Sequence, residues 1–561
     1  MTYKEDTIYK SSYTANQNWV KELDPRHMDS TLSSFKALKN EKRIITLCKP
    51  FVVFSKNSYS SPVTLPLGLA YIGGVLEKAD YNVKIIDATG GKRPMGIKRS
   101  LDNQYNIQGL STEEILEKID PNTFIFGISV MFSQHWIEHR SLIEKIKQKF
   151  TKIIIVAGGE HASAMPEYIM RDCPSIDYVI RGEGEFSMLE FSSNLFFGRS
   201  VNNIPGICFI NKQNKFVDNG LSKRIEHIDT LPRPAWHLLN PENYFQDYFS
   251  GLGLGGNRNM PILGTRGCPY QCTFCSSPSM WTTRYIMRDP VDIVDEIEWL
   301  TKEYKANDFE FFDLTAIIKK NWIIEFCNEL KKRGLNNITW QLPVGTRTES
   351  LDEEVLKAIY ETGCRFVCYA PESGSQHSLN IIKKRVKLDK LLKSVKSSIR
   401  IGHTTKLNFI IGFPHETLVD CLKTISFAMY CSFRFGVSDI LFSVFTPYPG
   451  SELFEKLKKE KKLTVNDNYF KKLIVQFDFT KGDSYCENIS ATTIVILRFL
   501  AFTLCYTIIY ITRPKMIYKL FKNIFQKKFF PNNILEQRLF EFYLRYKLKK
   551  KAKENLSLKK I

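Results

Sequence analysis

The chain has 561 residues, 43% of them hydrophobic and 25% charged, with a formal net charge of +20. This length is too great for one ordinary hydrophobic core, so about two to four domains are expected, and the composition excludes an intrinsically disordered protein. Thirteen cysteines, and a start at residues 1–21 that lacks an apolar signal-peptide segment, favour the reducing cytoplasm over secretion.

The first 40 residues are polar, and we expect a loose extension there. Between residues 41 and 200, apolar strand-like runs alternate with helical patterns. This alternation predicts an α/β domain whose parallel sheet carries helices on both faces and binds ligands outside the carboxyl ends of its strands. The predicted strands are 43–47, 83–87, 123–129, 153–157 and 177–180, and the predicted helices are 67–78, 112–119, 136–150, 166–172 and 185–195.

Three glycine-containing motifs lie in the loops of this domain: Pro66-Leu67-Gly68, then Gly158-Gly159-Glu160-His161, then Gly182-Glu183-Gly184-Glu185. Glycines at such positions either let the backbone approach a ligand closely or simply make turns. Residues 201–255 follow as a linker that we expect to pack along two domains, and its proline-rich stretch at residues 231–236 is expected to be extended.

A second α/β rhythm runs through residues 256–450. Six units with one sheet polarity predict a partial (β/α)6 barrel, whose active groups gather at the carboxyl ends of the strands. The predicted strands are 261–264, 309–313, 338–342, 366–370, 407–412 and 440–445, and the predicted helices are 290–304, 322–332, 352–362, 375–398 and 417–431.

The most specific feature follows the first of these strands, where Cys268, Cys272 and Cys275 have the spacing C-x3-C-x2-C. Three thiolates on one loop can bind three irons of a [4Fe–4S] cluster and leave the fourth iron open to a small molecule. A zinc knuckle is the alternative, but it needs a fourth ligand, and no second C-x2-C pair or nearby histidine supplies one. The reducing compartment disfavours a disulfide.

With Phe274 as the aromatic residue before the last cysteine, this loop resembles the C-x3-C-x-aromatic-C signature of the radical S-adenosylmethionine enzymes. The three motifs of the first domain, in their order, resemble the cobalamin-binding domain of the cobalamin-dependent members of that family. The resemblance implies three cofactors: a [4Fe–4S] cluster on the three cysteines, S-adenosylmethionine on the open iron, and cobalamin in the first domain.

The resemblance also implies which residues bind these cofactors. Glu372, Ser373 and Gly374 stand where the family has a motif for S-adenosylmethionine, although Ala370 replaces a common glycine and a plain strand-end turn is the alternative. Phe274 is expected beside the same cofactor. The expected cobalamin-binding residues are Pro66, Leu67, Gly68, Gly158, Gly159, His161, Gly182, Glu183, Gly184 and Glu185.

Further candidates lie at other strand ends, where family members face S-adenosylmethionine or the substrate. They are Asp313, Thr315, Arg347 and residues 410–414. For each of them, a purely structural role is the alternative. Arg266 either pairs with an acidic group near the cluster or caps the loop.

One departure concerns the cobalt. Classical cobalamin enzymes carry Asp-x-His-x-x-Gly, whose histidine binds cobalt, and this chain has no such run. His161 lies in a later loop, so we expect it to shape the pocket, and we expect the residue beneath the cobalt to come from residues 55–66.

After residue 450 the α/β rhythm stops, and residues 451–561 are expected to form a helical, basic region. Its apolar segment, residues 494–511, is a buried helix, an interfacial helix or a membrane span, and Arg498 within it disfavours a centred span. Residues 511–561 hold 15 lysines and arginines against 3 acidic residues, more than half of the excess charge of the chain. This concentration disfavours nucleic-acid binding and indicates either a solvated helix end or attraction to anionic lipid or an acidic partner.

By resemblance, the chain is a cytoplasmic enzyme that generates a 5′-deoxyadenosyl radical and methylates an unactivated carbon through methylcobalamin. The expected partners are a small-molecule substrate, for which the apolar tail favours a lipid-like compound, an electron donor such as flavodoxin or ferredoxin, and the membrane surface at the basic tail. Two alternatives stay open: a radical oxidative cyclase similar to the anaerobic magnesium-protoporphyrin ester cyclases, and a cobalamin-binding sensor with an inert cluster.

Overall fold

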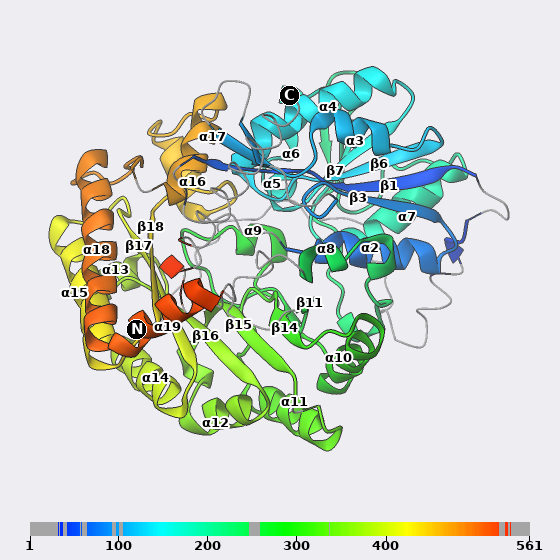
Figure 1. Ribbon diagram of the computed structural model, residues 1–561. Coiled ribbons are helices and arrows are strands. Elements are labelled where there is room, and N and C mark those ends of the chain that lie inside the picture. Colours follow the sequence, from blue (N-terminus) through cyan, green and yellow to red (C-terminus); the bar gives the residue numbers. More distant parts are fainter. Residues whose placement is uncertain are drawn as a thin grey trace, which may run out of the picture.

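The computed structural model shows two α/β units with a helical carboxyl-terminal region (Figure 1). In Figure 1 the first unit, blue and cyan, lies above the second, which is green and yellow, and orange helices flank both. The described residues are 32, 34–37, 42–56, 58, 64–91, 97–99, 105–245, 258–335, 337–478, 480–526, 533, 535, 536 and 539.

The first unit is built on a seven-stranded sheet with the order β10-β9-β8-β7-β6-β1-β3. The pairs among the five strands from β8 to β3 are parallel, as predicted, whereas β9 and β10 run antiparallel. Both antiparallel strands come from the predicted linker, so part of that linker extends the sheet of the first unit. The strands are β1 (Ile44–Lys49), β3 (Asn82–Asp87), β6 (Thr123–Ser129), β7 (Ile154–Gly158), β8 (Tyr178–Ile180), β9 (Ile207–Ile210) and β10 (Phe216–Asp218).

Helices cover both faces of this sheet because successive strand residues point to opposite sides. Ile45 and Ile125 belong to one hydrophobic cluster, with α2 (Leu67–Lys78) and α7 (Gly184–Phe196), and Phe126 and Ile155 belong to the other. The second cluster includes buried residues of α3 (Thr112–Lys118), α4 (Trp136–Lys149) and α6 (Pro166–Asp172). A small sheet that the sequence did not indicate lies beside this unit, formed by β2 (Val52–Ser55), β5 (Tyr105–Gln108) and β4 (Ile97–Arg99).

The second unit is a six-stranded parallel sheet with the order β11-β14-β15-β16-β17-β18. Its two outer strands do not pair with each other, so it is the partial barrel that the sequence predicts. The strands are β11 (Asn259–Ile262), β14 (Asp308–Phe311), β15 (Thr339–Thr346), β16 (Cys364–Glu372), β17 (Thr404–Ile411) and β18 (Asp439–Val444), and the long helices are α10 (Pro290–Tyr304), α11 (Lys320–Lys332), α12 (Glu353–Glu361), α14 (Leu388–Ile401) and α15 (Leu418–Arg434).

The prediction of one helix over residues 375–398 is wrong. The structure has α13 (Gln376–Ile381) and α14, separated by a turn in which Lys383 and Arg385 are left-handed, with φ of 55° and 54°. Tertiary partners bind the carbonyl groups of this turn: Arg347 donates to the carbonyls of Lys384 and Arg385. The break is therefore imposed by contacts distant in sequence.

The linker touches both units, as expected. The Ala235 amide donates to the Ala70 carbonyl on α2 at 2.9 Å, and the Arg233 guanidinium lies 2.7 Å from the Asp292 carboxylate on α10. The linker thus fastens one helix of each unit.

The carboxyl-terminal region is helical where it is described, with α16 (Glu452–Lys459), α17 (Asp467–Ile474), α18 (Ala491–Thr512) and α19 (Pro514–Gln526). Helix α18 contains the apolar segment and packs on α15 and β18. Among the described residues it is the one helix long and apolar enough to cross a membrane, and 44% of its most apolar window is buried in the protein. Arg498 points inward, where its guanidinium donates to the carbonyls of Gln476, Asp478 and Lys481.

Candidate active site

The cysteine loop lies between the short strand β12 (Thr265–Arg266) and helix α9 (Ser277–Trp281). Cys268, Cys272 and Cys275 are half-buried, and none forms a disulfide. The loop is tied down on two sides, because the Thr273 amide donates to the Ile382 carbonyl at 3.1 Å and the Leu453 amide donates to the Thr273 carbonyl at 2.9 Å. The three thiols are therefore presented by a fixed backbone.

Burial and nearby cations have opposite effects on the pKa values of the thiols. Their partial burial raises the pKa of all three, while the cationic Lys384 and Arg347 act in the opposite sense on Cys268 and Cys272. In the part of the chain that the structure describes, no three His, Cys, Asp or Glu side chains are grouped as ligands of a single metal ion. A [4Fe–4S] cluster does not need such convergence, because each thiolate binds a different iron.

Phe274 connects the cysteine loop to the end of β17. Its ring lies 5.6 Å from the Phe413 ring, and the Lys384 ammonium is 5.9 Å from its centre. The loop at residues 410–414 is held in turn by Glu416, whose carboxylate accepts the amides of Gly412 and Phe413 at 2.8 and 3.1 Å.

A buried ion pair that the sequence did not indicate lies beside the cysteine loop. The Lys384 ammonium is 2.8 Å from the Glu372 carboxylate, and both residues are buried. Burial lowers the pKa of Lys384, but Glu372 and Cys272 together hold it above its ordinary value. Lys384 sits in the turn that interrupts the predicted helix, so periodicity gave no sign that its side chain points inward.

Ser373 and Gly374 contact helix α15. The Ser373 hydroxyl lies 3.0 Å from the Thr424 hydroxyl, which also accepts the Gly374 amide at 3.0 Å. A Cβ atom at position 374 would lie 2.6 Å from the Phe427 Cβ, so close packing requires glycine there. Contact of these two residues with S-adenosylmethionine stays a prediction.

Asp313 and Thr315 offer polar atoms that the protein leaves unsatisfied at the end of β14. Asp313 accepts the Gly264 amide at 3.1 Å through Oδ2, whereas its Oδ1 and the Thr315 hydroxyl have no hydrogen-bond partner. Both side chains are buried, and burial raises the pKa of Asp313 to about 7. Buried polar atoms are ordinarily hydrogen-bonded, so this arrangement fits a polar ligand.

In the first unit, two of the predicted glycines are required by their backbone. Gly159 has φ of 108°, and a Cβ there would lie 2.9 Å from the Val130 carbonyl oxygen; Gly182 has φ of 85°. Gly158 has only one neighbour within 4 Å of its Cβ position, and Gly68 has none. Pro66 and Leu67 start helix α2 beside Gly68. These loops lie at the carboxyl edge of the parallel sheet, where its ligands bind.

His161 is buried among aromatic rings. Its Nδ1 lies 2.8 Å from the Ser133 hydroxyl, its ring is 5.5 Å from Trp136 and 5.6 Å from Phe470, and its Nε2 has no hydrogen-bond partner. Burial lowers the pKa of His161 to about 3, which keeps the ring neutral. The loop expected beneath the cobalt is described only in part, since residues 57 and 59–63 lie outside the described residues.

Glu183 and Glu185 have a role that the sequence did not indicate. The Arg266 guanidinium, just before the cysteine loop, lies 3.2 Å from the Glu183 carboxylate and 2.5 Å from the Glu185 carboxylate. All three side chains are buried. Arg266 therefore pairs with acidic groups, as one of its two predicted readings has it. The cobalamin contact expected of Glu183, Gly184 and Glu185 stays a prediction, and Gly184 packs against Ile72 of α2.

A second contact joins the cysteine loop to another loop of the first unit. The Ser276 hydroxyl, next to Cys275, donates to the Glu160 carboxylate of the Gly158–His161 motif. The cysteine loop thus touches two of the three glycine motifs of the first unit.

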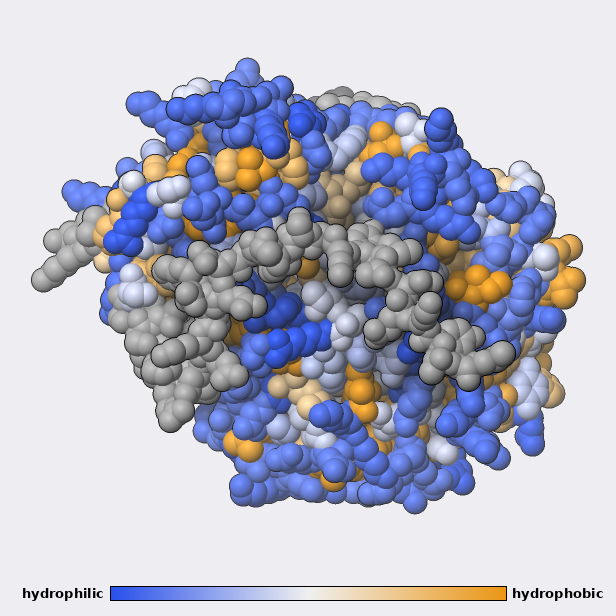
Figure 2. Space-filling model, turned by 180° about the vertical axis from the view of Figure 1, so that it is seen from behind, coloured by the Kyte–Doolittle hydropathy of each residue, from blue (hydrophilic) through white to orange (hydrophobic). Residues whose placement is uncertain are grey.

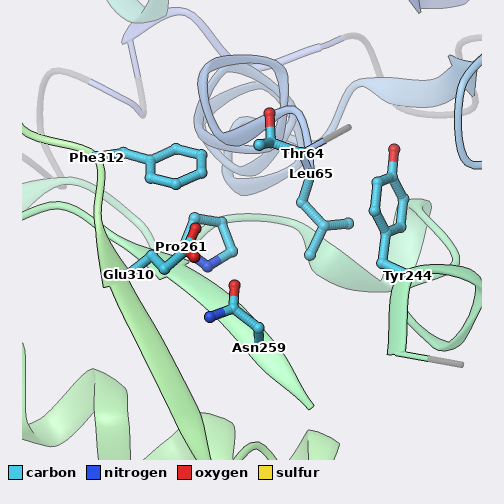
Figure 3. Close-up of a pocket in the computed structure, with 7 residues that line it drawn as sticks. All are labelled: Thr64, Leu65, Tyr244, Asn259, Pro261, Glu310 and Phe312. Carbon is cyan, nitrogen blue, oxygen red and sulfur yellow. The ribbon is translucent and has the colours of Figure 1, made fainter. Parts of the chain in front are cut away.

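A small cavity lies at the boundary between the two units (Figure 3). In Figure 3, side chains from β11 and β14 face residues that precede α2 and a tyrosine of the linker. Its walls combine apolar groups with a few polar ones: Thr64, Leu65, Tyr244, Asn259, Pro261, Glu310 and Phe312.

Comparison with known proteins agrees with this arrangement. The B12 binding domain model matches residues 60–191, and the radical SAM superfamily model matches residues 262–428. The chain is 32% identical over 392 residues to an uncharacterised methyltransferase, PH0819, of Pyrococcus horikoshii, covering 70% of this chain and 78% of that protein. It is 28% identical over 399 residues to an anaerobic magnesium-protoporphyrin IX monomethyl ester cyclase of Rubrivivax gelatinosus, covering 70% and 66%.

The fold resembles that of the radical S-adenosylmethionine methyltransferase TsrM from Kitasatospora setae, solved with cobalamin and a [4Fe–4S] cluster bound. The TM-score is 0.57 at 18% identity, over 75% of this chain and 78% of that one. With the domain matches and the relative from Pyrococcus, the chain belongs to the cobalamin-dependent radical S-adenosylmethionine enzymes, whose cofactors are a [4Fe–4S] cluster, S-adenosylmethionine and cobalamin.

Proposed function

We propose that this enzyme methylates a carbon atom of a small organic substrate bound between its two units. One observation carries the proposal: Arg266 and Ser276 hold the cysteine loop against two glycine motifs of the first unit, so the two expected cofactor regions are neighbours. When bound, the cluster with S-adenosylmethionine supplies the radical that activates carbon, and cobalamin supplies the methyl group.

The residues divide this work. Cys268, Cys272 and Cys275 hold the cluster, and the Lys384 ammonium offsets negative charge beside Cys272. Asp313 accepts a hydrogen bond from the amino group of S-adenosylmethionine, because its Oδ1 atom has no donor within the protein. The positive charge of that amino group would also stabilise the buried carboxylate in its ionised form. Gly159 and Gly182 let backbone approach cobalamin, and the neutral His161 forms a wall of its pocket.

A second outcome on the same scaffold is oxidative cyclisation without methyl transfer. It is favoured by the 28% identity to the Rubrivivax cyclase, which is close to the value for the methyltransferase relative. The proposal also includes a lipid-like substrate and an electron donor such as flavodoxin or ferredoxin. It further includes a cytoplasmic location with peripheral membrane contact.

The experiment is anaerobic incubation of the reconstituted enzyme with reductant, S-adenosylmethionine and candidate substrates. Methyl transfer yields both 5′-deoxyadenosine and S-adenosylhomocysteine, whereas cyclisation yields 5′-deoxyadenosine alone. If neither product forms, both proposals are contradicted, and the alternative of a cobalamin-binding sensor with an inert cluster is favoured. The Cys272→Ala variant is the background control.

A further inference from the structure

Apolar side chains gather on the outer surface of three neighbouring helices. Among the described residues, nineteen large hydrophobic side chains are exposed, and thirteen of them lie on α15, α18 and α19. Contacts join α15 to α18 and α18 to α19, so we call their outer surface the apolar face. Figure 2 shows the molecule from behind, so α15 and α18, on the left in Figure 1, lie on the right. Orange residues reach the surface at this right-hand edge.

Helix α18 is inverted relative to an ordinary surface helix. Ile496, Phe499 and Ile511 are 52%, 56% and 74% exposed, while Arg498, the one charged residue of the helix, is buried and bound to three carbonyl groups. Every exposed position of α18 is uncharged. A surface helix in water places its charged side chains outward. The outer side of α18 is therefore better suited to an apolar environment than to water.

The charge of the apolar face has one sign. The only acidic residue in the three helices is Asp420, which is buried. Basic residues are exposed on two of its three helices, with Lys423 and Arg434 on α15 and Lys515 and Lys522 on α19. On α19 the lysines alternate with exposed aromatic rings, a pattern typical of helices that lie in the interface of an anionic membrane.

We propose that the apolar face docks on an anionic lipid bilayer, with α18 lying along the membrane plane. At about 1.5 Å per residue its 22 residues extend for about 33 Å, which gives a long contact. Helix α18 does not cross the bilayer, because its inner side is bound to the protein: Arg498 holds three carbonyl groups, and the Tyr506 hydroxyl donates to the Asp439 carboxylate on β18.

The test is cosedimentation of the full-length holoenzyme with vesicles of pure phosphatidylcholine and with vesicles containing 30% phosphatidylglycerol. We expect binding to the anionic vesicles only, and its loss in 0.5 M salt. The variant Phe433→Ser/Phe499→Ser is expected to lower the bound fraction at least about tenfold, since each ring contributes apolar burial. Lys515→Glu/Lys522→Glu is expected to do the same through charge.

The matched control is Val291→Ser, which removes an exposed apolar side chain of α10, far in sequence from the face. Cluster absorbance and formation of 5′-deoxyadenosine are expected to be unchanged in every variant, which separates docking from catalysis. Equal binding to both vesicle types, or binding that survives both double variants, would overturn the proposal. So would a dimer that Phe499→Ser dissociates in the absence of any vesicle binding, because the face would then serve a second copy of the chain.

Discussion

The guanidinium of Arg266 lies 2.5 Å from the carboxylate of Glu185, in the interior of the protein and across the boundary between its two units. Arg266 immediately precedes the cysteine loop, and Glu185 opens helix α7 of the other unit. With Glu183 at 3.2 Å, one cation therefore serves two buried carboxylates. The pairing fixes where the cysteine loop sits relative to the first unit.

Replacing Arg266 with methionine is expected to destabilise the protein by about 3–5 kcal/mol, because buried Glu185 loses its counterion and buried Glu183 keeps only Arg224, at 3.5 Å. Urea unfolding measures this. The double variant Arg266→Met/Glu185→Gln is the control, and it should recover much of the loss, since Glu183 still pairs with Arg224 and Glu185 no longer leaves an unpaired charge.

A conservative substitution of Arg266 should separate the formation of the two products. Formation of 5′-deoxyadenosine depends on the barrel, whereas formation of S-adenosylhomocysteine depends on both units, so we expect the second to fall further than the first in Arg266→Lys, which keeps the charge. Equal losses of both products would show that Arg266 does not position the two units.

The cluster assignment predicts that Cys272→Ala loses most of its iron and all formation of 5′-deoxyadenosine. Cys486→Ala is the matched control, because Cys486 is also a half-buried free cysteine but lies outside the loop. Iron analysis and visible absorbance after anaerobic reconstitution measure the result. Retention of a full cluster by Cys272→Ala would refute the assignment.

The Lys384 ammonium is expected to raise the reduction potential of the cluster, since a nearby cation stabilises its more electron-rich state. Lys384→Met should lower the potential by an amount on the order of tens of millivolts, and Lys384→Arg should lower it less. Lys383→Met is the control, because that neighbouring ammonium is 48% exposed and pairs with Glu452. Identical potentials in Lys384→Met and Lys383→Met would contradict this role.

Asp313 makes the stability of the cofactor-free protein depend on pH. Its carboxyl has a pKa of about 7 when folded, against 3.8 as the ordinary value, because burial disfavours the charge. The folded protein therefore holds a proton that the unfolded chain releases between these values, and stability falls as pH rises from about 4 to about 7.

Asp313→Asn should remove that loss. Its stability relative to the unsubstituted protein is expected to improve by roughly 2–4 kcal/mol between pH 4.5 and pH 8, measured by urea unfolding. Asp389→Asn, at an exposed position of α14, should show no such trend. Parallel pH curves for Asp313→Asn and the unsubstituted protein would rule out this titration.

The sequence predicted what depends on local pattern. Helix α2 has the bounds that its apolar periodicity indicated, and every predicted strand of both sheets is present within a few residues. The order of the barrel strands follows from one polarity and short connections. These features are written in neighbouring residues, so the chain reveals them without its tertiary structure.

Contacts between distant residues were not predictable in this way. The partners Arg266 and Glu183 are 83 positions apart, and the turn at Lys384 exists because Arg347 binds its carbonyl from 37 positions away. Periodicity reports which side of an element is apolar, but it does not report which buried charge meets which. The strands β9 and β10 were missed because the proline-rich stretch at residues 231–236 led us to interpret the whole of residues 201–255 as a linker.

Asp478 connects the last part of the molecule to its first. Its carbonyl accepts from Arg498 of α18, and its carboxylate accepts from Ser55 of β2, 423 positions earlier in the chain. A deletion that removes α18 would therefore leave a carbonyl without its donor and loosen a strand at the opposite end of the sequence. Removing α18 would therefore disturb both the proposed membrane contact and the packing of the first unit. Point substitutions on the exposed side of α18 can separate membrane binding from catalysis, whereas a shortened chain cannot.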